Sequence, residues 1–243
     1  GVFREVTAAE ANATVRAALD AGITYFDTAP FYAATVAERV LGEALRGVGR
    51  DRYVMATKVG RYGQQDFDFS AGRMERSVDE SLARLGCGHI DVVQVHDVEF
   101  GSLPQIVDET LPALDRLRAS GKIRFVGITG LPLATLRHVQ SGVPALVDTV
   151  LSYCHGTLND TTFLPYASGL RASGVGVLNA APLAMGLLTR GGCPTWHPAP
   201  PALRRACAAA ADYCAHRGAD LADLALSYAF GLGELERTIV GLA

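Results

Sequence analysis

The sequence contains no run of apolar residues long enough for a membrane-spanning helix, which needs about 18 or more. It has no basic tract and a formal net charge of only −3, so neither nucleic acid nor an anionic membrane is expected as a partner. Its five cysteines are an odd number without C-x-x-C spacing, which argues against a metal site or a disulfide framework. This cysteine usage fits a reducing compartment, and we expect a cytoplasmic protein.

A glycine-rich phosphate-binding turn is also missing. Neither G-x-G-x-x-G nor a P-loop motif occurs, and the stretch from Asp27 to Tyr32 contains no glycine. An open, doubly wound sheet that binds nucleotides would carry such a turn between its first strand and first helix. The absence favours a closed parallel barrel over an open nucleotide-binding sheet.

The sequence does contain a regular alternation of strand and helix patterns. Seven β-branched runs are predicted as strands: 23–27, 53–58, 91–96, 124–129, 147–153, 175–180 and 238–242. Helices are predicted over 7–22, 35–47, 70–85, 102–121, 132–140, 160–174, 202–217 and 221–231. Alternating units of this kind indicate a parallel sheet buried on both faces. No linker-like stretch divides the chain, so we predict a single domain from 1 to 243.

The predicted architecture is an α/β fold of the (β/α)8 barrel type, which has eight strands, each followed by a helix. The chain opens on a helical pattern and stops on a strand. We therefore expect the first strand, before Val2, and the last helix, after Ala243, to be missing from this sequence.

Four polar residues mark the carboxyl ends of three of these predicted strands. Asp27 ends the first strand and Tyr32 follows five residues later, whereas Lys58 and His96 end the next two. In a parallel barrel, the loops at this edge converge on the active site. We therefore expect the four side chains to share one site.

This residue set suits hydride transfer between an alcohol and a carbonyl, because a proton must move on oxygen while a cofactor moves a hydride on carbon. A free tyrosine has a pKa of about 10, and a neighbouring ammonium such as that of Lys58 would lower it. Asp27 could hold Lys58 by an ion pair, and His96 could orient the substrate oxygen. Taken singly, each of the four residues also has an ordinary structural explanation. Their joint occurrence on successive strands carries the hypothesis.

Two groups of motifs resemble the aldo-keto reductase superfamily over essentially the whole chain. The signature segments are 26–32 (FDTAPFY), 57–58 (TK), 94–96 (QVH), 121–128 (GKIRFVGI) and 182–189 (PLAMGLLT). Segments 58–63, 67–70, 77–82, 96–101, 151–155 and 196–198 are similar to a branch of sugar dehydrogenases associated with ascorbate biosynthesis. The resemblance implies NAD-linked oxidation of the anomeric C1 of an aldose, such as L-galactose, to a lactone. It also implies Asp27, Tyr32, Lys58 and His96 as the catalytic residues.

The resemblance further implies binding residues. Cofactor contacts are expected at Thr129, Gly130, Ser152, Pro182, Leu183 and Gly186. Substrate contacts are expected at Arg61, Val98 and Trp196, on loops that should overhang the site. NAD is the expected cofactor, and NADP stays open because the usual phosphate-recognising segment would follow Ala243. No metal is expected.

Three functions remain open from the sequence. The first is the NAD(P)-linked sugar dehydrogenase, acting as a monomer or weak homo-oligomer on a small aldose. The second is a reductase of small aldehydes and ketones that uses NADPH. The third is a non-catalytic binding or regulatory module of the same fold, against which the intact tetrad argues.

Overall fold

The computed structural model describes residues 6–241, which form two compact units. The first unit runs to Val150 and the second runs from Leu151 to Gly241, so the division falls within one strand, β5 (Thr149–Tyr153). All strand pairings of known register are parallel, and the sheet order follows the sequence from β1 to β7. The seven predicted strands are therefore confirmed. The fold is that of the (β/α)8 barrel, as its similarity to solved structures reported below shows.

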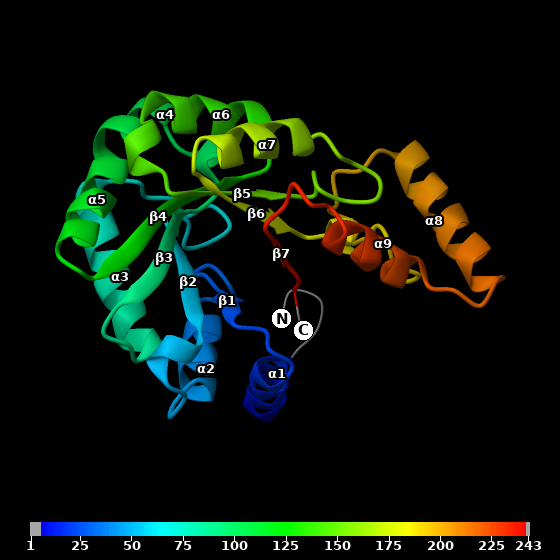
Figure 1. Cartoon of the computed structure of the whole chain (residues 1–243), viewed down its shortest axis with the longest axis horizontal. Helices are drawn as coiled ribbons and strands as arrows, with labels where there is room; N and C mark the ends of the chain where they lie inside the picture. The colour runs from blue at the N-terminus through cyan, green and yellow to red at the C-terminus, as the bar shows by residue number, and fades with distance from the viewer. Residues whose placement is uncertain (1–5, 242–243) are drawn as a thin grey trace. The chain divides into compact units, whose positions relative to one another are not determined.

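The first unit holds four strands and their helices (Figure 1). Its strands are β1 (Tyr25–Asp27), β2 (Val54–Val59), β3 (Ile90–Val95) and β4 (Ile123–Gly130). Its longer helices are α1 (Ala8–Asp20), α2 (Val36–Ala44), α3 (Ala71–Leu85), α5 (Leu111–Ala119) and α6 (Leu133–Gly142). Shorter turns are η1 (Arg50–Arg52), η2 (Val98–Phe100), α4 (Leu103–Gln105), η3 (Ile106–Thr110) and η4 (Pro144–Leu146).

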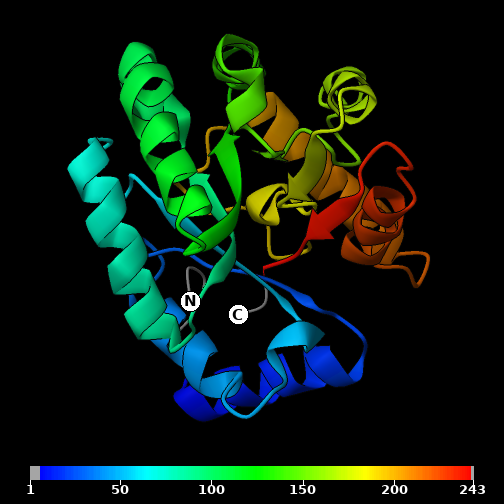
Figure 2. The same ribbon diagram turned by 60° about the vertical axis from the view of Figure 1, so that its left-hand side comes forward.

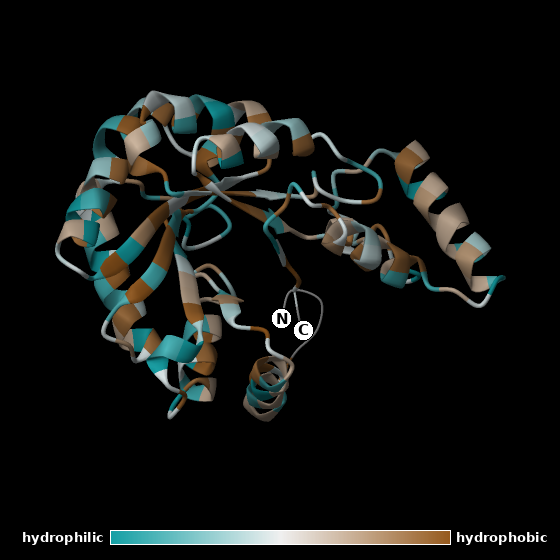
Figure 3. Ribbon diagram, viewed as in Figure 1, coloured by the Kyte–Doolittle hydropathy of each residue, from teal (hydrophilic) through white to brown (hydrophobic). Residues whose placement is uncertain are grey.

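Strands β2 and β3 of the first unit are buried because apolar residues point to both of their faces. Every residue of β3 is buried, as are all residues of β2 after Val54, and apolar residues recur along β3 and β4 (Figure 3). Helices α3 and α5 pack side by side, α3 against β2 and α5 against β4 (Figure 2). The near-continuous apolar runs that predicted a covered parallel sheet are thus explained.

The second unit contains β6 (Gly176–Ala180) paired with β7 (Arg237–Ile239). Its helices are α7 (Leu164–Ala172), η5 (Ala184–Gly186), α8 (Pro201–Ala215) and α9 (Leu221–Phe230). Leu187, Leu188, Cys207 and Cys214 belong to its hydrophobic core cluster. No helix among residues 6–241 is long and apolar enough to cross a membrane.

Several element bounds differ from the sequence prediction, and the predicted helix 102–121 is divided into α4, η3 and α5. Helix α7 begins at Leu164, because the side chain of Asp160 binds the backbone N–H of Thr162 in a local turn instead of capping a helix. Thr7 forms the predicted capping box with Glu10, but Thr35 makes no side-chain cap. Strand β7 ends at Ile239 instead of 242. The expected missing first strand, before Val2, lies outside the described residues.

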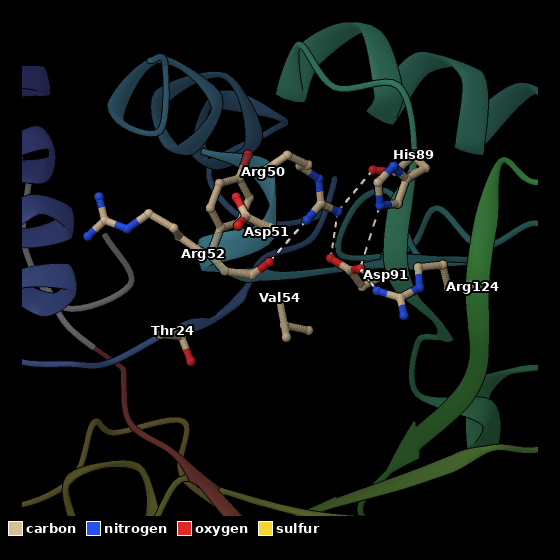
Figure 4. Close-up of a pocket in the computed structure, with 9 residues that line it drawn as sticks. Thr24, Arg50, Asp51, Arg52, Val54, His89, Asp91 and Arg124 are labelled. Atoms are coloured by element: carbon tan, nitrogen blue, oxygen red, sulfur yellow. Dashed lines mark hydrogen bonds and ion pairs between the residues drawn. The ribbon is translucent and has the colours of Figure 1, made fainter. Parts of the chain in front are cut away.

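At the amino-terminal ends of β2, β3 and β4, Asp91 links three elements of the first unit (Figure 4). Its carboxylate accepts from Arg50 at 2.5 Å, from Arg124 at 2.9 Å and from the Met55 N–H at 2.8 Å. Burial would raise the pKa of Asp91, but these three donors outweigh it and hold the pKa below its usual value. A cavity of about 540 Å³ beside this cluster lies at the opposite ends of β2 and β3 from Lys58 and His96. We therefore assign the cluster a structural role.

Replacing Asp91 with alanine is expected to lower the free energy of unfolding by about 3 kcal/mol. The loss belongs to the lower end of the range for broken buried pairs, because Arg50 and Arg124 keep contact with water. A carboxyl with a depressed pKa stabilises the fold above its unfolded pKa, and this stabilisation is lost as the pH falls below about 4. Urea unfolding of both proteins at pH 7 and pH 3 checks this. If the difference in free energy of unfolding between the parent and Asp91→Ala is the same at both pH values, the structural role assigned to the ionised Asp91 is contradicted.

Candidate active site

The four predicted catalytic residues all belong to the first unit and lie at the carboxyl ends of its strands. Asp27 is the last residue of β1, Lys58 is next to last in β2, and His96 follows β3 directly. Tyr32 lies in the turn after β1. The structure brings all four side chains together, as the following contacts show.

Lys58 is the centre of the polar contacts. Its Nζ donates a short hydrogen bond to Asp27 Oδ1 and a second one, of 3.0 Å, to the backbone carbonyl of Thr28. The same Nζ lies 4.6 Å from the centroid of the Tyr32 ring. Lys58 is only 2% exposed, so its charge is compensated by protein groups and not by water.

Gln94 is a member of this site that sequence reasoning did not single out. Its Nε2 donates to Asp27 Oδ2 at 2.9 Å, so each oxygen of Asp27 is bound by a different side chain. Gln94 is paired in register with Lys58 on the neighbouring strand. Its position two residues before His96 could have revealed it, because alternate residues of a strand share one face.

Tyr32 and His96 meet edge to face. Their ring centroids are 5.7 Å apart with an interplanar angle of 90°, and Phe31 packs against both rings. His96 is 4% exposed, and its Nδ1 has no hydrogen-bond partner in the part of the chain that the structure describes. Packing therefore helps to position both rings, and Tyr32 also has a side-chain hydrogen bond with Lys58.

The protonation states follow from burial and from two cations. Burial raises the pKa of Tyr32, and Lys58 opposes this rise without cancelling it. The expectation of a net lowering is therefore wrong for the free protein, although Lys58 acts in the predicted direction. Burial, Lys58 and Arg61 together lower the pKa of His96 well below its usual value. His96 is consequently a neutral imidazole at pH 7.

The turn that carries Tyr32 has an unusual backbone. Ala33, Ala34 and Thr35 have φ angles of 50°, 49° and 72°, in the left-handed region that favours glycine. Hydrogen bonds from Thr35 N to the Pro30 carbonyl, at 2.8 Å, and from Val36 N to the Ala33 carbonyl, at 3.1 Å, close this turn. Strained backbone persists where the surrounding structure over-determines it, and it clusters at functional sites. The strain explains why Thr35 does not cap α2 in the predicted way.

A buried carboxylate fastens the start of α2 to β2. Glu38 is fully buried and accepts from Thr57 Oγ1 at 2.6 Å and from Arg84 Nε at 2.5 Å. Thr57 directly precedes Lys58 in β2. Glu38 thus links the segment that follows Tyr32 to the strand that carries Lys58.

The cofactor candidates of the first unit, Thr129 and Gly130, end β4. Thr129 Oγ1 accepts a hydrogen bond of 3.0 Å from the Asp97 N–H. A Cβ atom on Gly130 would lie 2.6 Å from Glu99 Oε2, so this position has no room for a larger residue. Glu99 Oε1 accepts from the Leu131 N–H, whereas Oε2 has no partner within residues 6–241.

The cofactor candidates of the second unit are Ser152, Pro182, Leu183 and Gly186. Ser152 is fully buried, and its Oγ has no hydrogen-bond partner among the described residues. Gly186 has a φ of 93°, and a Cβ there would lie 2.8 Å from the Gly192 carbonyl oxygen. Backbone geometry therefore already accounts for this glycine. A cofactor role of all four residues stays a prediction.

The substrate candidates differ in accessibility. Arg61 is largely buried in the first unit, where it pairs with Asp97 at 2.5 Å. Val98 is fully buried, and Trp196, in the second unit, is 59% exposed and stacks on His197. Their contact with substrate stays a prediction.

Residues 6–241 contain no group of three or more histidine, cysteine or acidic side chains placed to hold a metal.

Comparison with known proteins identifies the family. The model of the aldo/keto reductase family matches residues 2–242. The chain belongs to the aldo/keto reductase family. Its members are oxidoreductases that use NAD(P)H, and the tetrad geometry described above fits that chemistry.

Several known proteins are similar over most of the chain. L-Galactose dehydrogenase of Arabidopsis thaliana is 49% identical over 245 residues, which cover the whole chain and 76% of that protein. D-Arabinose 1-dehydrogenase of Saccharomyces cerevisiae is 36% identical over 88% of the chain and 67% of that protein. The solved holo form of the aldo-keto reductase AKR11C1 from Bacillus halodurans superimposes with a TM-score of 0.79 at 25% identity. It covers 98% of this chain and 78% of the solved one.

Proposed function

We propose that this aldo/keto reductase is an aldose 1-dehydrogenase that uses NAD to oxidise the anomeric C1 of L-galactose, or of a similar aldose, to the lactone. The observation that carries the proposal is the buried site in which Asp27, Lys58, Tyr32 and His96 converge. The 49% identity with L-galactose dehydrogenase over the whole chain supports this substrate class. The similarity to the yeast D-arabinose 1-dehydrogenase, whose named substrate is also an aldose, supports the same substrate class.

The chain offers polar groups that fit a bound dinucleotide. Ser152 Oγ and Glu99 Oε2 are buried atoms without hydrogen-bond partners in the described structure, and such atoms are normally satisfied by a ligand or water. Thr129 and Gly130 lie at the end of β4, beside Glu99. We assign Thr129, Gly130 and Glu99 of the first unit to the nicotinamide side of the site, and we propose Ser152 of the second unit separately as a cofactor contact. When bound, the nicotinamide ring supplies the hydride acceptor.

The reaction needs a base at the C1 hydroxyl. Oxidation removes a proton from oxygen together with the hydride on C1, and Tyr32, as the phenolate, takes that proton. Lys58 stabilises the phenolate, and Asp27 holds Lys58 in place by the short ion pair. His96 stays neutral and hydrogen-bonds the substrate oxygen, which fixes C1 at the mouth of the site.

A cofactor-reduction assay with a panel of aldoses tests the function. Absorbance of the reduced nicotinamide is followed with L-galactose, D-arabinose and D-galactose, each with NAD and with NADP. The reverse assay uses aromatic aldehydes and NADPH. We expect kcat/KM to be largest for L-galactose with NAD, and at least about tenfold above any aromatic aldehyde, since each tenfold ratio reflects about 1.4 kcal/mol of transition-state binding.

The two alternatives predict other outcomes of the same assay. Equal or greater turnover of aromatic aldehydes would identify an aldehyde reductase instead. No turnover at all, with dinucleotide binding retained, would identify a non-catalytic module.

We propose that the protein is cytoplasmic and is a monomer or weak homo-oligomer. Light scattering on the same sample measures its oligomeric state.

A further inference from the structure

Asp97 is a buried carboxylate beside the tetrad that the proposed mechanism does not use. It follows His96 directly and is 4% exposed. Its φ of 54° lies in the left-handed region, which an aspartate adopts at a cost. The Asp97 N–H donates to Thr129 Oγ1, which holds the residue in this conformation. An observed backbone outlier at the edge of an active site calls for a functional explanation.

The partner of Asp97 is rigidly held. Arg61 donates to Asp97 Oδ2, and its guanidinium lies 4.0 Å from the centroid of the Phe31 ring. Phe67 and Phe100 stack on one another at 4.9 Å and flank the same guanidinium at 5.5 and 5.4 Å. Since three rings confine Arg61, the position of the Asp97 carboxylate is preorganised.

The carboxylate is spaced from His96 in a way that suits a substrate. Asp97 Oδ2 lies 3.7 Å from His96 Nε2, too far for a direct hydrogen bond. Both side chains are buried, with exposures of 5% for Asp97 and 6% for His96. A neutral His96 with its proton on Nε2 is a donor, whereas Asp97 is an acceptor. The site therefore presents a donor and an acceptor side by side.

This pair matches two neighbouring oxygens of a sugar. An oxygen on the reacting carbon accepts from His96 Nε2, and a hydroxyl on the adjacent carbon donates to Asp97 Oδ2. Oxygens on adjacent carbons can approach to about the length of a hydrogen bond, roughly 2.8 Å. The two contacts can thus run in parallel from atoms that are 3.7 Å apart. A simple aldehyde fills only the first of the two positions.

We propose that Asp97 is a specificity-determining residue that accepts a hydrogen bond from the hydroxyl on the carbon next to the reacting carbon. The site then selects α-hydroxy aldehydes, including aldoses, over aldehydes without that hydroxyl. The inference rests on one part of the proposed function, namely that the site around the tetrad binds the reacting carbonyl or hemiacetal carbon. It adds a recognition group that the tetrad lacks.

The test combines removal of the substrate hydroxyl with removal of the carboxylate. L-Galactose is compared with 2-deoxy-L-galactose in oxidation, and 2-hydroxypropanal is compared with propanal in reduction. For the unmodified enzyme, we expect loss of the hydroxyl to lower kcat/KM by about 10- to 100-fold, the usual strength of a hydrogen bond to a charged group. In the Asp97→Ala enzyme, the two members of each pair should differ by less than about threefold.

Two further variants keep the test interpretable. Asp97→Asn keeps a residue type that tolerates the left-handed backbone, but it removes the charge. Its selectivity ratio, which is kcat/KM with the substrate hydroxyl divided by kcat/KM without it, should therefore fall between those of the parent and of the Asp97→Ala enzyme. Asp91→Asn is the matched control, because Asp91 is also buried and arginine-paired but lies at the other end of β3. It should cost stability and leave the selectivity ratio unchanged. Propanal turnover is measured for each variant, and the ratio of the two substrates within each enzyme separates the lost hydroxyl contact from a general loss of activity.

The outcomes separate this inference from the proposed function. If no aldose is oxidised but 2-hydroxypropanal is still preferred in an Asp97-dependent way, the sugar specificity fails and the role of Asp97 stands. If the parent enzyme oxidises L-galactose and its 2-deoxy form equally well, the role of Asp97 is overturned while the sugar dehydrogenase function stands. An equal loss on all four substrates in the Asp97→Asn enzyme would also overturn it.

Discussion

Replacing Tyr32 with phenylalanine is expected to lower kcat by about 10²- to 10⁴-fold, the range typical of a lost general acid–base group. Phenylalanine keeps the ring that packs edge to face on His96 and that lies beneath Lys58 Nζ. Only the hydroxyl that takes the substrate proton in the proposed mechanism is lost. Affinity for the dinucleotide should therefore stay nearly constant. Steady-state rates with L-galactose, together with titration of the dinucleotide by protein fluorescence, measure both quantities.

Tyr25 provides the matched control for this substitution. Its hydroxyl is also buried, two residues before Asp27 on β1, and it has no hydrogen-bond partner in the described part of the chain. Tyr25→Phe removes the same atom from the same unit and should leave kcat within about twofold, because no proton-transfer contribution is lost. A Tyr32→Phe enzyme that folds normally and keeps near-parental turnover would remove Tyr32 from the mechanism.

The convergence of the four site residues could be predicted from sequence because of how a parallel sheet places its residues. Runs such as 53–58 and 91–96 are mostly apolar and end in a titratable residue, so burial of the run places that last side chain at the sheet edge. The carboxyl ends of neighbouring parallel strands meet at one edge. The observed contacts of Lys58 with Asp27 and with the Tyr32 ring follow from that arrangement.

The balance of energies at Tyr32 could not be predicted from sequence. Sequence reasoning gave the charge of Lys58 its correct effect, but the opposing effect of burial depends on everything that packs around the ring. The roles of Gln94 and Asp97 could not be predicted for a related reason. A polar residue within or just after a buried strand gains a role only through its partners, here Asp27 and Arg61, which are remote in sequence.

Local backbone conformation was the least predictable feature. Thr35 has the spacing of a capping box with Glu38, but Glu38 is instead drawn into the buried bonds with Thr57 and Arg84. The preceding residues adopt left-handed conformations that alanine rarely takes. Tertiary packing overrides local preference here, at the turn that positions Tyr32.

Lys58→Met is expected to reduce both activity and stability. Methionine fills much of the volume of the lysine stem, but it removes the ammonium that stabilises the Tyr32 phenolate. Asp27, with a side chain only 6% exposed, would keep Gln94 as its side-chain donor. Breaking a buried ion pair from one side typically costs about 3–5 kcal/mol. We therefore expect a loss of this size in urea unfolding at pH 7, together with a large fall in kcat.

The pH dependence distinguishes the two effects of this substitution. In the proposed mechanism, oxidation needs the deprotonated form of Tyr32, and burial already raises the pKa of that group. Without Lys58 the pKa rises further, so any remaining activity should need a higher pH than that of the parent enzyme. The raised pKa of Lys58 itself stabilises the fold fully below about pH 10, so its loss is felt throughout the neutral range.

The chain offers an internal control, since Lys58 and Lys122 are its only two lysines. Lys122 forms an ion pair with Asp79 in which both side chains are well exposed, and such pairs contribute about 0–1 kcal/mol. Lys122→Met should therefore change neither the pH profile nor the activity. If Lys58→Met shifts the unfolding midpoint but leaves the pH–rate profile in place, Lys58 is a structural residue and does not tune Tyr32. A profile displaced to higher pH in Lys58→Met alone is the result that the buried ion pair predicts.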